Sequence, residues 1–212
     1  MTESSLHIQC LIGIQCQDFT MLAADQTSTL SIIVMKNDVN KLHDLTSKQV
    51  LGIIGDSGDT MQLTQFICKN LMLYQMKNGY QLSTEAVVHF IRKNVMESLK
   101  SGTPCIVNML VGGYDQLEGG QLYTLDFLAS ALRVPYGVHG FGGIICLGLL
   151  DRYHKSTMTE TEGYDLIKTC VHQIHERLFI NLPNFQVKLV NKDGIQTLPA
   201  ITPATFAAQI NF

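Results

Sequence analysis

A carboxylate at the end of a buried strand constrains this chain more than any other feature of its sequence. Residues 6–16 place apolar side chains at every second position, and this period of two predicts a half-buried strand. A second strand is expected over residues 19–25, where Leu-Ala-Ala leads directly into Asp25. An unpaired charge there would be costly, so Asp25 is expected to have a cationic partner.

Lys41 is the expected partner of Asp25. It follows a third apolar strand, predicted over residues 31–36, and a turn over residues 37–40. A structural ion pair is the favoured interpretation, because removing one member of a buried pair strands the other charge at about 3–5 kcal/mol. Retained catalytic chemistry is the alternative.

This arrangement resembles the proteasome β-type subunit family of N-terminal threonine hydrolases. Active members begin at a threonine, have a glycine four residues later, an aspartate in a Gly-Ala-Asp-like segment, and a lysine sixteen residues after that aspartate. Gly13, Asp25 and Lys41 match these positions, and the position of the nucleophile falls on Gln9. The identity of residue 9 therefore decides the expected function.

Gln9 cannot act as the family's nucleophile. A terminal threonine reacts because its own α-amino group accepts the hydroxyl proton while a nearby lysine lowers the pKa of the system. Gln9 has no hydroxyl, and residues 1–8 precede it without the glycine that marks the cleavage junction in the family. The resemblance implies a vestigial site of Asp25, Lys41 and Asp151 with no catalytic residue.

Two processed forms would expose a different nucleophile. Removal of Met1 would expose Thr2, which lies seven positions upstream of the required register. Cleavage after Gln9 would expose Cys10, but a shift of one residue on a strand turns the side chain to the opposite face. An active N-terminal-nucleophile peptidase produced by such processing is the alternative function.

Two further family segments also bear on the site. Active members support the threonine with serines in a Gly-Ser-Gly-Ser-like segment and with an aspartate at a Leu-Asp step. The serine segment corresponds to residues 140–143, Gly-Phe-Gly-Gly, and the Leu-Asp step to Leu150 and Asp151. The hydroxyls are absent there, and Phe141 is expected to fill their space. These glycines match no phosphate-binding motif and indicate a tight strand-to-helix turn.

The rest of the chain alternates between blocks of strands and pairs of helices. Strands are predicted over residues 50–55, 105–114, 121–127 and 185–189, and helices over 60–78, from 83 to about 102, through 150–153, and from 159 onward. Segregated blocks predict an α+β fold, in which helix pairs outside two sheets bury both sheets. The resemblance implies the four-layer αββα sandwich of N-terminal-nucleophile hydrolases.

The composition favours an assembly subunit over a free monomer. Charged residues make up 16% of the 212 residues, against about 25% in typical globular proteins. Part of the surface is therefore expected to be apolar and covered by partners.

No linker divides the chain, so residues 1–212 are predicted to form one domain. A C-terminal tail from about residue 198, which contains two prolines, is expected to lie along another subunit.

Several other classes of function are not expected. The net charge of −3 and the lack of Lys/Arg clusters argue against nucleic-acid binding. No apolar run reaches the roughly 18 residues of a membrane span, and no signal-peptide pattern is visible. His172 and His175 are expected to share a helix face beside Glu176, but no third ligand has a recognisable spacing, so no metal or other cofactor is predicted. The six cysteines are predicted to be separate buried free thiols.

The resemblance extends over nearly the whole chain. The segments that carry it are LIGIQ at 11–15, GDSGDT at 55–60, DRY at 151–153 and NLPNF at 181–185. The chain most resembles a eukaryotic, non-catalytic member of the family. This implies a structural β subunit of the 20S core particle, in an inner ring that supports catalytic neighbours during ubiquitin-dependent protein degradation. The implied partners are α and β subunits of a stacked-ring hetero-oligomer, and the implied location is the cytoplasm and nucleus.

Overall fold

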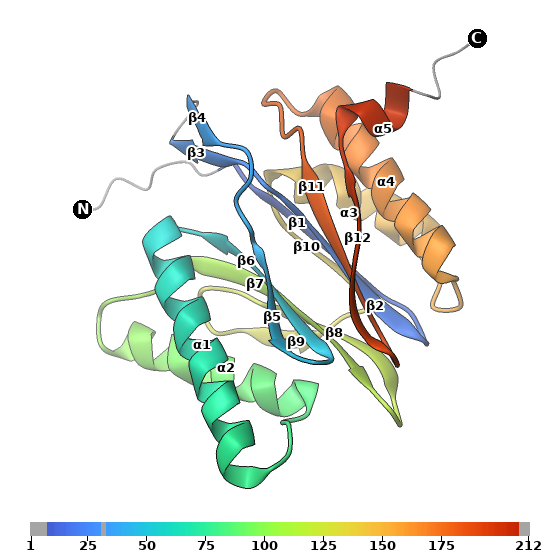
Figure 1. Ribbon diagram of the computed structural model, residues 1–212. Helices are drawn as coiled ribbons and strands as arrows, with labels where there is room; N and C mark the ends of the chain where they lie inside the picture. The colour runs from blue at the N-terminus through green and yellow to red at the C-terminus, as the bar shows by residue number, and fades with distance from the viewer. Residues whose placement is uncertain (1–7, 31–32, 208–212) are drawn as a thin grey trace.

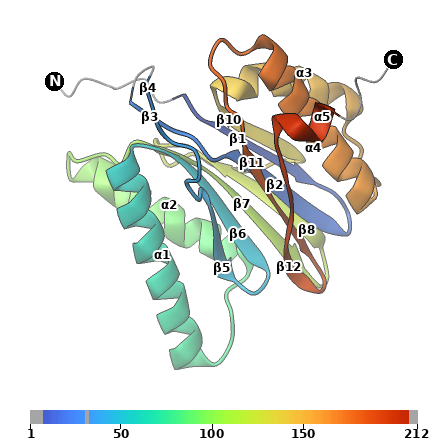
Figure 2. The ribbon, with the colours of Figure 1, turned by 45° about the horizontal axis from the view of Figure 1, so that its top comes forward.

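The computed structural model describes residues 8–30 and 33–207 of the chain. Two five-stranded antiparallel sheets lie face to face, and a pair of helices covers the outer side of each sheet (Figure 1). Figure 2 shows the same four layers from another side. The predicted α+β fold with αββα layers is therefore confirmed.

The first sheet has the strand order β10-β1-β2-β11-β12 and is covered by α3 and α4. Its central strands bring together segments far apart in sequence, because β2 pairs with β1 on one side and with β11 on the other. Its elements are β1 (Cys10–Gln15), β2 (Phe19–Asp25), β10 (Tyr136–Gly140), β11 (Phe185–Asn191), β12 (Gly194–Ile201), α3 (Phe141–Tyr153) and α4 (Glu160–Arg177).

The second sheet has the order β5-β6-β7-β8-β9 and is covered by α1 and α2. Its elements are β5 (Leu42–Thr46), β6 (Gln49–Gly55), β7 (Val107–Asp115), β8 (Gly119–Leu125), β9 (Ala131–Arg133), α1 (Ser57–Asn78) and α2 (Thr84–Lys100). None of the helices within the described ranges is long and apolar enough to cross a membrane.

A separate hairpin of β3 (Ser28–Leu30) and β4 (Ile33–Lys36) lies at one end of the sandwich. The strand predicted over residues 31–36 is thus present from residue 33, while residues 31 and 32 lie outside the described part of the chain. Every side chain of β4 is exposed, so this apolar strand lies outside the core. Apolar composition therefore did not imply burial for β4.

Local capping chemistry explains where the helices begin and end. The Asp56 side chain accepts hydrogen bonds from two backbone N–H groups in the first turn of α1, and Gly79 ends that helix at φ 78°. Ser83 caps α2. Thr159 and Glu162 form a capping box at the start of α4. Each capping residue lies within a few positions of the backbone groups with which it forms hydrogen bonds. The ends of these helices could therefore be predicted from local sequence.

The hydrophobic core has three layers, one under each helix pair and one between the two sheets. Because β1 lies between two of these layers, both of its faces are buried, and the predicted half-buried strand is wrong in this respect. A side chain at Gly13 would come within 2.8 Å of the Leu22 side chain and would also meet Leu110. Glycine at position 13 therefore allows the two sheets to pack closely.

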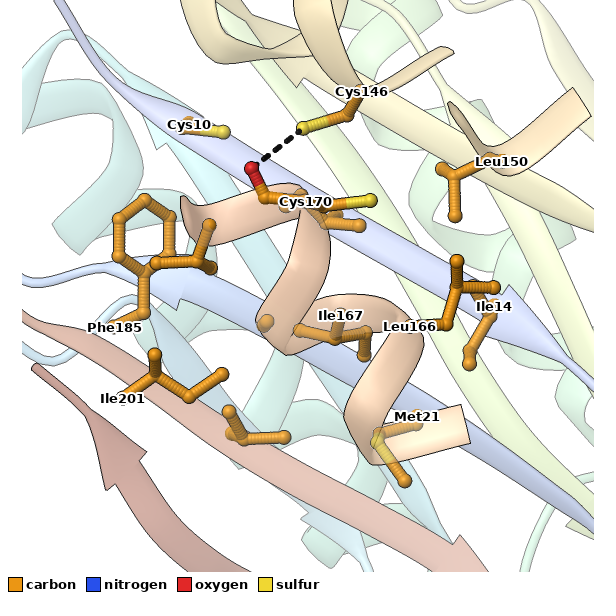
Figure 3. Close-up of a cluster of buried hydrophobic side chains, with 14 of the residues drawn as sticks. Cys10, Ile14, Met21, Cys146, Leu150, Leu166, Ile167, Cys170, Phe185 and Ile201 are labelled. Carbon is orange, nitrogen blue, oxygen red and sulfur yellow. Dashed lines mark hydrogen bonds between the residues drawn. The ribbon is translucent and has the colours of Figure 1, made fainter. Parts of the chain in front are cut away.

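Three cysteines lie together in the core beneath α3 and α4 (Figure 3). Cys10 comes from β1, Cys146 from α3 and Cys170 from α4, and the Cys146 thiol lies 3.9 Å from the Cys170 carbonyl oxygen. Hydrogen bonding to Cys10, together with burial, raises the pKa of Cys146, and hydrogen bonding to Cys146, together with burial, raises the pKa of Cys170. All six cysteines are free as predicted, but these three are grouped rather than separate, and Cys68 and Cys105 are only partly buried.

Residues 198–207 form regular structure within this chain, and the expected contact of this segment with another subunit stays a prediction. Leu198 pairs with Val187 within β12, and α5 (Pro203–Ala207) follows, with Phe206 stacked on His172 at 4.8 Å between ring centroids. The two prolines are compatible with this regular structure. Pro199 lies on an edge strand and Pro203 at the first position of a helix, where the missing N–H is tolerated.

Candidate functional site

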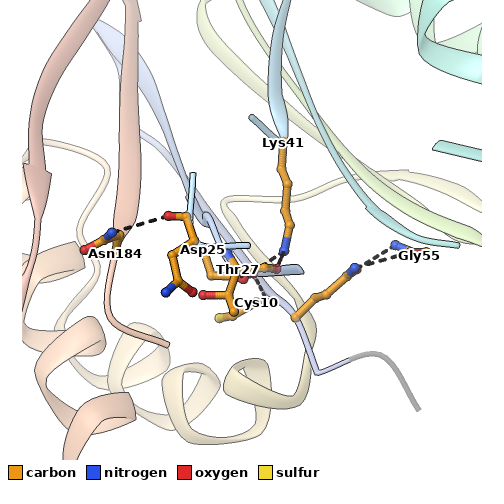
Figure 4. A network of polar contacts seen from close by, with 8 residues as sticks. Cys10, Asp25, Thr27, Lys41, Gly55 and Asn184 are labelled. Atoms are coloured by element: carbon orange, nitrogen blue, oxygen red, sulfur yellow. Dashed lines mark hydrogen bonds and ion pairs between the residues drawn. The ribbon is translucent and has the colours of Figure 1, made fainter. Parts of the chain in front are cut away.

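Four segments meet at one end of the sandwich and bring together the residues singled out in the sequence (Figure 4). Gln9 directly precedes β1, Asp25 ends β2, Lys41 directly precedes β5, and Gly55 ends β6. Two of these strands belong to each sheet. The candidate site is therefore formed where the two sheets come together.

Asp25 and Lys41 form the expected buried ion pair. The Lys41 Nζ lies 2.8 Å from Asp25 Oδ2 and 2.8 Å from the Thr27 carbonyl oxygen. The carboxylate also accepts the N–H of Cys10 at 2.7 Å and that of Thr27 at 3.0 Å. Burial raises the pKa of the Asp25 carboxyl, against the opposing effect of Lys41 and the two N–H groups. The pair joins the starts and ends of three strands and is closed to solvent.

Gln9 connects both sheets through its side chain and its backbone. Its Oε1 accepts the N–H of Gly55 at 2.7 Å, and its Nε2 donates to the Gly55 carbonyl oxygen at 3.3 Å. Its own carbonyl oxygen accepts the N–H of Phe141, the first residue of α3, at 3.0 Å. Gly55 has a φ of 139°, and a side chain there would collide with the Ile106 carbonyl oxygen, so this position requires glycine.

Two hollows flank the Gln9 side chain. One has a volume of about 180 Å³ and includes Lys41 and His43 in its wall. The other has a volume of about 270 Å³ and includes Phe141 and Ile144. Gly140 and Phe141 therefore lie beside position 9, and Phe141 lines the larger hollow without filling it.

The sequence interpretation missed His43 as a residue of the site. Burial, with the charge of Lys188, lowers the pKa of His43, while Asp44 acts in the opposite direction. Its imidazole is therefore neutral near pH 7. His43 belongs to β5, a strand that the sequence analysis did not predict, so its position beside Lys41 could not be inferred. Its only sequence signal is its closeness to Lys41 along the chain.

Asp151 is not brought to this cluster. It lies ten residues after Phe141 on α3, about 15 Å along the helix axis at 1.5 Å per residue. Its carboxylate is exposed and accepts a hydrogen bond from the Tyr136 hydroxyl at 2.8 Å, which raises the pKa of Tyr136. The assignment of Asp151 to the vestigial site therefore does not fit the geometry.

Of the two other nucleophile candidates, Cys10 lies within the described part of the chain. The Cys10 thiol is fully buried under α3 and α4, on the opposite side of the chain from the Gln9 side chain. This agrees with the register argument. Thr2 lies outside the described part of the chain.

The histidine pair on α4 has packing partners of its own. His172 Nε2 lies 3.3 Å from a Glu176 carboxylate oxygen, and His172 stacks on Phe206. His175 Nε2 lies 2.8 Å from the Leu182 carbonyl oxygen. In residues 8–30 and 33–207, no group of three or more His, Cys, Asp or Glu side chains could hold a metal ion.

Known proteins resemble this chain over most of its length. The family described as "Proteasome subunit" matches residues 7–190. A Saccharomyces cerevisiae protein, "Proteasome subunit beta type-4", is 36% identical over 187 residues, which cover 88% of this chain and 94% of that protein. "Proteasome subunit beta type-2" of Oryza sativa subsp. japonica is 38% identical over 187 residues, 88% of each chain. The Dictyostelium discoideum protein of the same name is 32% identical over 199 residues, 92% of this chain and all of that protein.

Proposed function

This chain belongs to the proteasome subunit family, and from that premise we propose that it is a non-catalytic β subunit of the 20S core particle. The resemblance inferred from residues 9–41 is confirmed by the family match, and the similar proteins named above are all β subunits. Members of this family assemble with other proteasome subunits. The proposal concerns what this subunit contributes to the assembly.

The chemistry of residue 9 carries the proposal. Gln9 stands where active members of the family have their threonine, and it offers neither a hydroxyl nor a thiol. Its amide is also engaged on both sides, as acceptor from the Gly55 N–H and as donor to the Gly55 carbonyl. Lys41 is engaged by Asp25 and Thr27. The cluster is therefore organised as a structural junction between the sheets.

The outer surface supports a role within an assembly. Large apolar side chains on the outer helices are well exposed, including Met76 of α1 at 74% and Ile144 of α3 at 81%. Such surfaces usually mark contacts with partner proteins. We place the subunit in an inner ring, where it would support the positions of catalytic neighbours during ubiquitin-dependent degradation.

We also propose that the subunit works in the cytoplasm and nucleus. The support is chemical, because its six cysteines are all free, and free thiols are typical of reducing compartments. Localisation of a fluorescently tagged chain in cells of the source organism tests this, and accumulation in a secretory compartment would contradict it.

The alternative is an active peptidase exposed by processing after Gln9. Its nucleophile would be Cys10, whose thiol lies in the core beneath α3 and α4. A rearrangement of β1 would be needed to turn this thiol toward Lys41. The intact mass of the subunit in purified particles separates the two functions, since the alternative requires a chain that starts at Cys10.

Reaction with a threonine-directed inhibitor is the direct test. Purified particles are treated with a labelled epoxyketone or boronate, and each subunit is analysed by mass spectrometry. We expect adducts on catalytic subunits of the same particles, which serve as the internal positive control, and none on this chain. An adduct on any residue of this chain would contradict the proposal.

A further inference from the structure

Strand β12 lies at the end of the first sheet, and it pairs with β11 on one side only (Figure 1). Asn191 and Gly194 close the two-residue turn between these strands, and hydrogen-bonded pairs alternate with non-bonded pairs along an antiparallel ladder. The N–H and carbonyl groups of Ile195 and Thr197 therefore point away from β11. In the described part of the chain, these groups have no hydrogen-bond partner.

The first half of β12 lacks the features that usually protect an exposed edge. Natural edge strands carry charged side chains, prolines or bulges, which prevent another chain from pairing with them. The edge strands of the second sheet, β5 and β9, contain Asp44 and Arg133, whereas β12 contains no charged residue. Pro199 and the register shift opposite it lie in the second half of β12. Residues 194–198 are therefore open to pairing.

A hollow of about 370 Å³ lies beside this open half, between the sheet and the start of α4. Leu189 and Leu198 provide apolar wall, and Glu160 and Asp165 provide carboxylates. Glu160 accepts a hydrogen bond from the Asn191 side chain at 2.9 Å. Among the residues that the structure describes, neither carboxylate forms an ion pair. The hollow therefore suits a side chain with an apolar stem and a positive charge.

A strand added to this edge would bring such a side chain to the hollow. Neighbouring strands lie about 4.8 Å apart, and directly opposed residues point their side chains to the same face of a sheet. Because Leu198 lines the hollow, the residue opposite Leu198 would extend over it. A lysine or arginine there would lay its methylene groups against the leucines and place its charge near Glu160 and Asp165.

We propose that the open edge of β12 binds an extended segment of a neighbouring subunit, with a lysine or arginine opposite Leu198. The backbone groups of Ile195 and Thr197 supply the pairing, and the hollow selects the side chain, as in other cases of strand addition. Charge identifies this occupant, because an acidic segment would place like charges beside Glu160 and Asp165. This inference rests on the proposed function, since it requires an assembled particle.

Photocrosslinking in purified particles tests the identity of the occupant. Gln196 is exposed and lies on the same face of β12 as Leu198, so p-benzoylphenylalanine is introduced at this position. After irradiation, we expect a cross-link to one other subunit, in a segment that carries a lysine or arginine beside the labelled residue. A cross-link within this chain, to a segment without a basic residue, or to no subunit would overturn the inference.

Competition for incorporation tests the backbone pairing. A tagged variant and the untagged wild-type chain are produced together, and their ratio in purified particles is measured. Thr197→Pro removes one outward N–H while the bonds to β11 remain, so we expect about fivefold lower incorporation, as for the loss of one hydrogen bond. Thr197→Val keeps the N–H and the branched shape and should match the wild type. Equal incorporation of the two variants would contradict the pairing.

The two carboxylates are tested in the same competition. Glu160→Gln combined with Asp165→Asn removes both charges but keeps an acceptor for the Asn191 amide, and we expect about threefold lower incorporation. Asp38→Asn combined with Glu97→Gln makes the same change of charge at two exposed positions elsewhere and should match the wild type. Equal losses in the two double variants would overturn the role of the hollow.

Failure of the inference and failure of the proposed function give different results. An inhibitor adduct on this chain would overturn the proposed function and leave the cross-link from position 196 unchanged. Without the expected cross-link, and with no adduct, the inference is wrong and the proposed function stands. The free energy of unfolding of purified Thr197→Pro should stay close to that of the wild type. If this variant does not fold, the double variant of Glu160 and Asp165 decides the inference.

Discussion

Two Asp–Lys pairs in this chain have nearly the same length and very different surroundings. Asp25 and Lys41 lie 2.8 Å apart with both side chains buried, at 0% and 6% exposure. Asp44 and Lys188 lie 2.7 Å apart, but Asp44 is 54% exposed while Lys188 is 8% exposed. The first pair connects strand ends at the candidate site, and the second connects β5 of one sheet with β11 of the other.

The difference shows that a contact distance does not determine the energetic importance of an ion pair. The cost of breaking a pair depends on the charge that remains and on whether water can reach it. In the first pair, either remaining charge is buried. In the second, a remaining Asp44 would be solvated, whereas a remaining Lys188 would not. The two pairs therefore predict a graded series of variants.

Lys41→Ala should have the largest effect. It leaves the Asp25 carboxylate buried and without its cation, so we expect a loss of about 3–5 kcal/mol in the free energy of unfolding. Urea denaturation of the purified chain measures this loss, and the yield of assembled particles should fall as well. Correctly assembled particles should keep their specific peptidase activities.

The combination Asp25→Asn with Lys41→Met serves as the control for this first prediction. With both charges removed, the double variant should be more stable than Lys41→Ala, because no ionised group is left buried. A selective loss of one peptidase activity in assembled Lys41→Ala particles would show that Lys41 acts on a neighbouring site.

Asp44→Asn should have an intermediate effect. It leaves the Lys188 ammonium largely buried without its carboxylate, and we expect a loss of about 1–3 kcal/mol, the range for a buried group left without a full partner. The loss in the free energy of unfolding is measured by the same urea experiment. If Asp44→Asn lowers the free energy of unfolding as much as Lys41→Ala does, the exposure of Asp44 does not affect the cost of breaking the pair.

Lys188→Met should have a small effect, about 0–1 kcal/mol. The methionine keeps most of the apolar stem, and the remaining Asp44 carboxylate is in contact with water. The comparison with Asp44→Asn is the decisive measurement, since both variants break the same 2.7 Å contact. Equal losses for the two variants would contradict the explanation from burial.

The smallest effect concerns the titration of His43. Burial and Lys188 lower its pKa and Asp44 raises it, so Lys188→Met should raise the pKa of His43 and Asp44→Asn should lower it further. NMR titration of the imidazole measures both shifts.

The lowered pKa of His43 also predicts a pH dependence of stability. Because the pKa is lowered in the folded state, the contribution to the free energy of unfolding is present above the unfolded value of about 6.5 and is lost as the pH falls below it. His43→Gln should reduce this pH dependence, and an unchanged dependence would contradict the assignment.

Features that depend on neighbouring residues could be predicted from the sequence alone. The caps at Asp56, Gly79 and Thr159 satisfy backbone groups within a few positions of themselves. The Asp25–Lys41 pair was also predictable, because a carboxylate at the end of an apolar strand requires a cation and the family spacing indicates one. The αββα fold follows from the order of the segments together with the resemblance.

Other features were decided only by the tertiary structure. Whether β1 is buried on one face or two depends on a second sheet whose strands come from elsewhere in the chain. The bond between Gln9 and Gly55 spans 46 positions, and Asp151 is separated from the site by the length of α3. Pro199 is compatible with a strand only because β12 lies at a sheet edge. In each case the partner is distant in sequence, so no local pattern could identify which groups face each other, which edge is free, or which charge stays in contact with water.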